Sequence, residues 1–207
     1  MPRLDAGEYL TLTEINNVSR WLGGQNEYKI LEFDDPYMRV DVNGTMYDVW
    51  CRCMLTSLEL QLNGDMPYGF VASFICDSPY GYITLASTTT TLESGSTTIN
   101  FNNISCNNGY YFPRITYSGS SALGTFELIN QSDGNRRFNI SNIESSVRSV
   151  VVDSEKCVIT NNAGINLYKN CNFVFPKFIN GNNVLSISGA TGSTVTIERI
   201  FPVDMMK

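Results

Sequence analysis

The sequence of 207 residues contains no histidine. This absence excludes the Ser-His-Asp and Cys-His arrangements of many hydrolases, and it excludes metal sites that are ligated by histidine. Neither a G-x-G-x-x-G pattern nor a P-loop occurs, so the sequence has no motif for binding a nucleotide phosphate. We therefore expect a protein that is not an enzyme and that carries no cofactor.

Charged residues are also scarce, at 16 % of the chain, and the net charge is −6. No basic cluster occurs, which argues against direct binding of nucleic acid, because phosphate contacts supply much of that affinity. No run of 18 apolar residues is present, so we expect no membrane span. The first ten residues lack the apolar core of a secretory signal, so we expect none.

Acidic side chains give only weak indications of chemistry. Asp34-Asp35 precede a proline, and Asp153 and Glu155 flank Ser154. A glycosidase needs two carboxylates that face each other across a cleft, whereas neighbouring acidic residues are typical of turns. A glycosidase stays a minor alternative. The stretch D-V-N-G-T, residues 41–45, resembles the start of a calcium loop but lacks the closing glutamate, and a hairpin turn explains it better.

The six cysteines form no C-x-x-C pair; they are Cys51, Cys53, Cys76, Cys106, Cys157 and Cys171. A structural zinc site usually combines two such pairs or includes histidine. Small buried hydrophobic residues in a reducing cytosol are therefore the better interpretation, and we expect no metal.

The first half of the sequence predicts one helix followed by strands. Ile15, Val18, Trp21 and Leu22 recur at helical spacing, which predicts a short helix over residues 12–22 with Thr13 as its N-cap. Alternating apolar segments then predict strands around residues 28–33, 37–42, 45–55 and 69–76. The leucines at positions 55, 58, 60 and 62 fit a further strand, and Asn63-Gly64 after them suits a turn. Asn43-Gly44 predicts a tight hairpin turn, because both residues accept positive φ angles.

A threonine-rich segment over residues 83–101 marks a change in composition, and it fits either a solvated connection or a polar edge strand. We place the domain boundary at residues 85–98. The predicted domains are 1–90, β-rich with the short helix, and 91–207. About eight short strands at intervals of about 10–12 residues predict a sandwich for the second domain. One of these strands covers residues 172–178, and the closing stretch FPKFINGNNVLSIS, residues 175–188, reads as a strand, a turn and a returning strand.

Two groups of aromatic residues stand out, at residues 110–112 and at positions 173, 175 and 178. Core packing, contact with a partner protein and stacking on a sugar are all open for them. A sugar site needs an exposed aromatic platform beside polar side chains. The best local candidates are Asn107, Asn108, Tyr110 and Tyr111.

The order of several short motifs resembles the distal tail protein family of siphophage-type tails and prophage tail components, over roughly residues 12–207. The first half ends in a Cys-x-x-Pro-like segment at Cys76, Pro79 and Tyr80. The matching residues of the later motifs, in chain order, are Phe112, Pro113 and Ile115, then Val152, Asp153 and Glu155, then Phe175, Pro176, Phe178, Gly181, Asn182 and Val184.

This resemblance implies a mainly β protein, with an N-terminal antiparallel domain followed by a jelly-roll or galectin-like sandwich. It implies a structural component at the distal end of the virion tail, made in the bacterial cytoplasm, with no catalytic residues. Family members form a ring, commonly a hexamer, between the tail tube and the baseplate or tip. The implied partners are further copies of the chain, the tail tube protein, and tail-tip, baseplate and receptor-binding proteins.

Members of the family generally carry further strands before the helix, whereas this sequence begins almost at the helix. Three interpretations are open: a member with a shortened ring-forming domain, a fragment of a longer chain, or a ring that is made differently. The alternative function is that of a carbohydrate-binding module or adhesin of β-sandwich type, for which a glycan would be the partner. Fold alone does not decide between the two.

Overall fold

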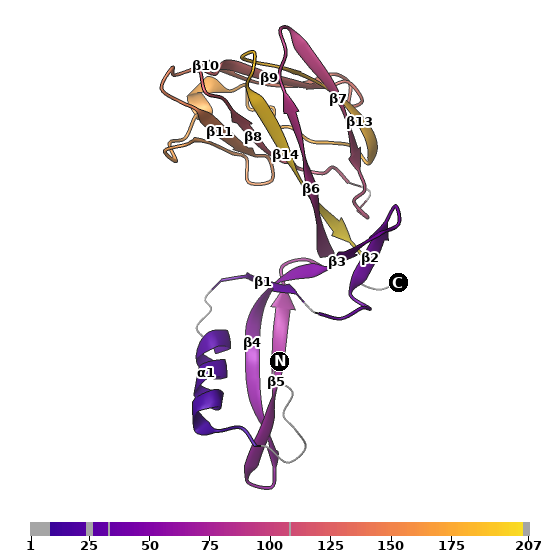
Figure 1. Cartoon of the computed structure of the whole chain (residues 1–207), viewed down its shortest axis with the longest axis vertical. Coiled ribbons are helices and arrows are strands. Elements are labelled where there is room, and N and C mark those ends of the chain that lie inside the picture. The colour runs from indigo at the N-terminus through magenta and orange to yellow at the C-terminus, as the bar shows by residue number, and fades with distance from the viewer. Residues whose placement is uncertain (1–8, 24–26, 33, 108, 205–207) are drawn as a thin grey trace. The chain divides into compact units, whose positions relative to one another are not determined.

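The computed structural model describes residues 9–23, 27–32, 34–107 and 109–204. The chain divides into two compact units, which are residues 1–82 with 204–207 (unit 1) and residues 83–203 (unit 2). Both units are built mainly from antiparallel strands, with one α-helix in the described part of unit 1, so the predicted fold class is confirmed (Figure 1). The predicted domain boundary at residues 90 and 91 stays a prediction.

The helix of unit 1, α1 (Leu12–Gly23), has the predicted extent. The predicted N-cap is wrong, because Thr11 rather than Thr13 holds this position. The Thr11 hydroxyl accepts a hydrogen bond from the Glu14 backbone N–H at 3.3 Å, and the Glu14 carboxylate accepts one from the Thr11 backbone N–H at 2.8 Å. This reciprocal pair is a capping box. The helix packs against β4, and none of its side chains is fully buried.

The strands of unit 1 are β1 (Lys29–Glu32), β2 (Arg39–Val42), β3 (Thr45–Asp48), β4 (Trp50–Asn63) and β5 (Met66–Cys76). β4 pairs with both β1 and β5, and β2 pairs with β3. The β2–β3 turn is formed by Asn43 and Gly44 with φ of 53° and 84°, so the predicted turn is confirmed. β6 (Gly81–Thr91) begins in unit 1, where Tyr82 pairs with Trp50.

Unit 2 is a sandwich of two antiparallel sheets (Figure 1). The strands of one sheet lie in the order β6, β14 (Thr194–Val203), β8 (Arg114–Ser118), β11 (Ser149–Asp153), β12 (Val158–Asn161). The strands of the other lie in the order β10 (Arg136–Ile143), β9 (Gly124–Asn130), β13 (Gly181–Ser188), β7 (Ser96–Asn103). A short 3-10 helix, η1 (Tyr168–Asn170), follows β12. The predicted sandwich is confirmed, while its likeness to galectins stays a prediction.

The core of unit 2 follows from period-two alternation along these strands. Inward-facing side chains on β8, β11, β13 and β14 are fully buried, for example Ile115, Val150, Leu185 and Ile197. The Tyr117 ring stacks on Phe126 with 4.7 Å between the ring centroids, and its hydroxyl donates to the Leu123 carbonyl at 3.0 Å. Buried apolar surface is the main favourable contribution to stability, so this core stabilises unit 2.

Two segments of unit 2 differ in how well the sequence predicted them. The threonine-rich segment forms two strands, β6 and β7, and β7 is an edge strand of its sheet, which agrees with the predicted polar edge strand. The strand predicted over residues 172–178 is wrong. This segment is irregular, and Phe178 makes only an isolated bridge with Tyr111. Pro176 cannot donate a hydrogen bond to a sheet, which fits this result.

The cysteines only partly follow the prediction of small buried residues. Cys51 and Cys53 are buried, whereas Cys76 and Cys157 are exposed, and none of the six forms a disulfide. In the described residues, no three cysteine or acidic side chains are arranged to hold a metal ion. As for membranes, no described helix has both the length and the apolar character required for a span.

Candidate assembly surface

Unit 1 leaves most of its large apolar side chains exposed. Of the eighteen exposed large hydrophobic residues in the described chain, fourteen belong to unit 1, while only three of the twenty-eight buried hydrophobic residues, Val49, Cys51 and Cys53, do. Monomeric proteins rarely expose extensive apolar surface unless a partner covers it. This imbalance identifies unit 1 as the candidate assembly surface.

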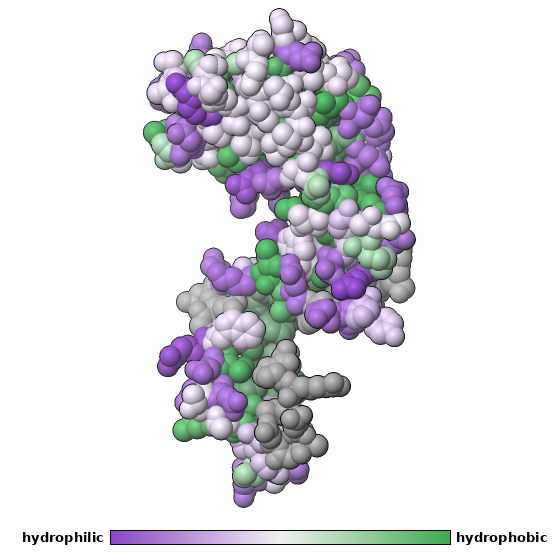
Figure 2. All heavy atoms as spheres, in the orientation of Figure 1, coloured by the Kyte–Doolittle hydropathy of each residue, from purple (hydrophilic) through white to green (hydrophobic). Residues whose placement is uncertain are grey.

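The β4–β5 hairpin carries half of these exposed residues, and we call residues 54–75 the hairpin arm. The exposed apolar residues of the arm are Leu60, Leu62, Met66, Tyr68, Val71, Phe74 and Ile75. Figure 2 shows apolar surface over this hairpin. Because successive strand residues point to opposite faces, neighbours such as Phe74 and Ile75 place apolar groups on both faces of the arm.

Two register shifts shape the arm. One lies between Leu55 and Ser57, and the other between Gln61 and Leu62. Leu55 pairs with Phe74 and Leu58 pairs with Ala72, so the first shift brings two leucines with odd spacing onto the same face. The leucines predict a strand here, and the bulge accounts for the spacing of three residues between Leu55 and Leu58.

β5 also offers an unpaired edge. In the described part of unit 1 it pairs with β4 alone, so backbone N–H and C=O groups along its other side have no strand partner. Pro67 and Gly69 interrupt that edge, and natural edge strands use such residues to limit uncontrolled pairing. The arm thus combines apolar side chains with a partly protected edge.

The base of the hairpin is held by polar and aromatic contacts. The rings of Trp50 and Tyr82 stack with 4.9 Å between their centroids. The Arg52 Nε lies 3.0 Å from the Asp77 Oδ2, and the Asp77 backbone N–H donates to the Arg52 carbonyl at 3.0 Å. These contacts fix the end at which β4 and β5 leave the rest of unit 1.

The first matched motifs of the family resemblance lie at strand ends. Cys76 is the last residue of β5, and Pro79 and Tyr80 lie in the turn before β6. In unit 2, Phe112 is exposed, whereas Pro113 and Ile115 are buried at the start of β8. These positions lie at strand ends and in turns, and their role in the family stays a prediction.

The acidic motif is a turn that follows β11. Val152 is buried in this strand, and Asp153 ends it, with its carboxylate accepting a hydrogen bond from the Lys156 backbone N–H at 3.1 Å. Glu155 is exposed in the turn. The hydrogen bond from Lys156 to Asp153 stabilises the turn.

The closing motif is held by three buried asparagines that the sequence interpretation missed. We call Asn103, Asn130 and Asn183 the asparagine clamp. Asn183 Oδ1 accepts hydrogen bonds from the Ile179 backbone N–H and from Asn130 Nδ2, both at 2.9 Å. Asn103 Nδ2 and Asn183 Nδ2 both donate to the Ile179 carbonyl, at 3.0 and 2.9 Å.

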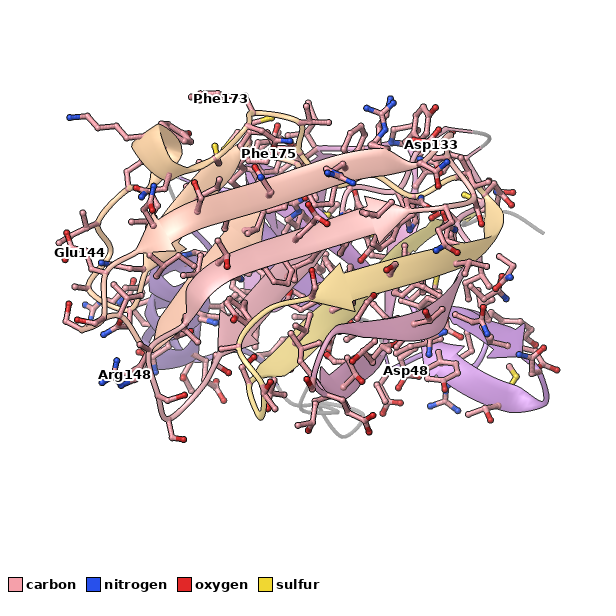
Figure 3. All side chains as sticks on the ribbon, turned by 90° about the horizontal axis from the view of Figure 1, so that it is seen from above. Asp48, Asp133, Glu144, Arg148, Phe173 and Phe175 are labelled. Atoms are coloured by element: carbon pink, nitrogen blue, oxygen red, sulfur yellow. The ribbon has the colours of Figure 1, made fainter. Side chains whose placement is uncertain are left out.

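The clamp explains how an irregular segment closes the sandwich. Phe178 is fully buried, and Gly181 begins β13 with φ of 83°, a conformation that favours glycine. Phe175 stacks on Phe138, while Phe173 is 64 % exposed. In Figure 3, Phe173 lies farther from the strands than Phe175 does. Asn182, a matched residue of the closing motif, is exposed. The signal for Asn183 was its spacing of two from Leu185, which places it on the inward face.

The candidate sugar residues do not form an open aromatic platform. Tyr111 is 8 % exposed, and its hydroxyl donates to the Glu198 carbonyl at 2.7 Å. The Lys177 Nζ lies 3.6 Å from the ring centroid of Tyr110, so one face of this ring is occupied. Asn107 is partly buried, and Asn108 lies outside the described residues. A sugar contact by this group stays a prediction.

Comparisons with known proteins identify the family of the chain. A family model described as a phage tail protein N-terminal domain matches residues 4–78, and one described as a phage tail C-terminal domain matches residues 80–198. Among curated proteins, none matches the chain.

Two solved structures share the fold. One is the Dit protein of phage SPP1, described as a paradigm of the hub adsorption apparatus in phages that infect Gram-positive bacteria; it is 14 % identical with a TM-score of 0.57, covering 95 % of this chain and 74 % of that one. The other is a chain of the phage P2 baseplate in its activated conformation with Ca, 8 % identical with a TM-score of 0.53, covering 90 % and 73 %. With both family models together spanning nearly its whole length, the chain belongs to this family of phage tail proteins.

Proposed function

We propose that the chain is a non-enzymatic distal tail protein that assembles through unit 1 into a ring joining the tail tube to the tail tip or baseplate. The observation that carries this proposal is the uneven burial, with a closed core in unit 2 and an exposed apolar surface on unit 1. When another subunit covers an apolar surface of this kind, the free energy of the assembly falls.

A ring fits the arm better than a two-fold dimer does. The arm is apolar on two faces, so one face is left uncovered when a single neighbour packs against the other. A heterologous interface repeated around an axis gives every subunit a neighbour on each side, and a closed ring leaves no end subunit. The ring we expect is a hexamer, as the family resemblance implies.

The two structural neighbours support the same role. One is described as part of a hub adsorption apparatus, and the other comes from a baseplate. They share this fold across 95 % and 90 % of the present chain. For this chain we infer a position between the tail tube protein and the tip or baseplate proteins, with the ring as the common platform.

The test is the solution mass of the full chain by light scattering, followed by negative-stain imaging. Six copies of the 23.1 kDa chain have a mass of about 139 kDa. The disrupting variant combines Leu62→Lys and Val71→Lys in the arm. Val71 lies directly opposite Glu59, so the new lysine gains a cross-strand partner and the hairpin is preserved.

The expected loss follows from exposure. Leu62 is 54 % and Val71 48 % exposed, so about half of each side chain remains to be buried at an interface. Full burial of such a side chain contributes about 1.5–3 kcal/mol, so the two lose about 2 kcal/mol together, or about thirtyfold in the association constant of each interface.

The matched control is Ile165→Lys, because Ile165 is 61 % exposed but belongs to unit 2. We expect rings from the unaltered chain and from this control, and smaller species from the arm variant. A chain that remains monomeric at high concentration, with and without the tail tube protein, would contradict the proposal. So would rings that persist unchanged in the arm variant.

A further inference from the structure

Three cysteines meet at the base of the hairpin. Cys51 and Cys53 are two residues apart on β4 and therefore point to the same face. Cys76, the last residue of β5, is the direct register partner of Cys53. The Cys53 Sγ and Cys76 Sγ lie 3.1 Å apart, although neither belongs to a disulfide.

The backbone at this pair already suits a disulfide. Directly opposed residues on antiparallel strands have Cα atoms about 4.5 or 5.5 Å apart, depending on their hydrogen-bonding position. Disulfides form at Cα separations of about 4.4–6.8 Å, so both positions lie inside the allowed range. The two sulfur atoms need to approach by about 1 Å to reach a bond of about 2.05 Å, which side-chain rotation can supply.

The two thiols differ in access. Cys53 is 4 % exposed, whereas Cys76 is exposed. Burial raises the pKa of the Cys53 thiol to about 12, so Cys53 is protonated near neutral pH. A reagent in solution therefore reaches Cys76 first, and Cys53 is held beside it for the second step.

We propose that Cys53 and Cys76 form an oxidation site that closes into a cross-strand disulfide when the chain meets a small-molecule disulfide. The Cys76 thiolate attacks one sulfur of the reagent and releases one reagent thiolate. Cys53, losing its proton to solvent, then attacks Cys76 sulfur in the mixed disulfide and releases the second. Two protein thiols are oxidised, the reagent is reduced to two thiols, and the released protons balance the charge.

The site fits a protein that works in two redox environments. Disulfides are rare in a reducing cytosol and persist outside the cell. A phage tail protein is made in the first environment and acts in the second, so the pair would remain reduced during synthesis and close after release. The bond would fasten β5 to β4 at the base of the arm. The inference needs only the register of the hairpin and does not depend on ring formation.

The experiment incubates the purified full chain with reduced glutathione or with oxidised glutathione. The chain is then denatured, its remaining thiols are alkylated, and its peptides are mapped by mass spectrometry without reduction. The reduced chain should carry six alkyl groups, one on each cysteine, and the oxidised chain should lose two of these groups. One cross-linked peptide should contain Cys53 and Cys76.

Variants separate this pair from the other thiols. Cys76→Ser should abolish the loss of two groups, and the substitution is mild because Cys76 is exposed. Cys51→Ser and Cys157→Ser should each retain that loss, since the first changes the neighbouring thiol and the second an exposed thiol of unit 2.

Three results would overturn the proposal. The first is full alkylation after oxidation, and the second is a stable glutathione adduct on Cys76 with no cross-link. The third is a cross-link between any other two cysteines in the unaltered chain. Because the readout is covalent, it is independent of whether the chain forms rings, and failure of one proposal leaves the other testable.

Discussion

Asn183 should be one of the most sensitive positions in unit 2. Its side chain is fully buried and joins the three asparagines of the clamp to the segment that closes the sandwich. Replacing it with alanine removes four hydrogen bonds of 3.0 Å or less, to the Ile179 N–H and carbonyl, to Asn130 Nδ2, and to the Gly181 carbonyl.

The magnitude follows from which partners keep another bond. At about 1 kcal/mol for each hydrogen bond, the upper sum is about 4 kcal/mol. The Ile179 carbonyl still accepts from Asn103, and Asn130 Nδ2 still donates to the Lys177 carbonyl at 3.3 Å. The Ile179 N–H has no replacement among the described side chains. We therefore expect Asn183→Ala to lower the free energy of unfolding by about 3 kcal/mol.

The measurement is urea unfolding of the full chain, followed by circular dichroism. Both tryptophans, Trp21 and Trp50, belong to unit 1, so tryptophan fluorescence reports that unit separately. The matched control is Asn182→Ala. Asn182 is the neighbour of Asn183 and is exposed, so this substitution should change the free energy of unfolding by no more than about 0.5 kcal/mol. Equal losses in the two variants, or a loss below about 1 kcal/mol in Asn183→Ala, would refute the assignment of the clamp.

Three further predictions concern other parts of the chain. Burial raises the pKa of Tyr111 to about 12, whereas an unfolded tyrosine ionises near pH 10. Stability should therefore be complete below pH 10 and fall by roughly 3 kcal/mol as the pH rises to 12, and Tyr111→Phe should remove this fall in urea titrations. Gly189→Ala should cost about 1–3 kcal/mol in the same assay, because a Cβ there would lie 2.7 Å from the Tyr117 hydroxyl, whereas Gly109→Ala meets no neighbour and should be neutral. Thr11→Ala should weaken α1 by about 1 kcal/mol and reduce the helical signal in circular dichroism. Hydrogen bonds from the Thr11 backbone and side chain lower the pKa of Glu14, so the capping box should be complete above pH 4.5, the usual pKa of a glutamate, and should weaken as the pH falls below it.

The sandwich could be predicted because its strands carry their own pattern. Val195 and Ile197, or Leu185 and Ile187, alternate with polar residues, and that period of two exists only if one face is buried. The tight turn at Asn43 was equally readable, because few residues accept its backbone conformation. Local chemistry determined these features, so the sequence was sufficient.

The strand predicted over residues 172–178 was wrong because contacts with distant parts of the sequence determine the structure of this segment. Phe173 and Phe175 alternate like strand residues, yet Phe173 has φ of 58° and lies exposed. Asn183 resembles a turn residue in the sequence, and its burial becomes evident only when Asn103 and Asn130 are brought beside it from other strands. A polar residue in an inward position of an alternating strand is the signal that could have shown it.

The assembly surface was invisible for a different reason. The leucines of the arm predicted a strand, and they do form one, but a pattern of apolar residues does not say whether the covering surface comes from the same chain. Leu60 and Leu62 are exposed because unit 1 has nothing further to place over them in the described chain. The exposure itself had to be seen before a partner could be inferred.

The stability of unit 1 must therefore come largely from outside an ordinary core. Hydrophobic burial normally offsets the conformational entropy lost on folding, and among the described residues of unit 1 the buried hydrophobic side chains are only Val49, Cys51 and Cys53. Subunit contacts along the arm would supply the missing burial. A disulfide between Cys53 and Cys76 would instead restrict the unfolded chain. Closing the loop between these two residues should raise the free energy of unfolding by about 3 kcal/mol. The two contributions act on different states of the same unit, so oxidation should stabilise unit 1 even in a variant that cannot assemble.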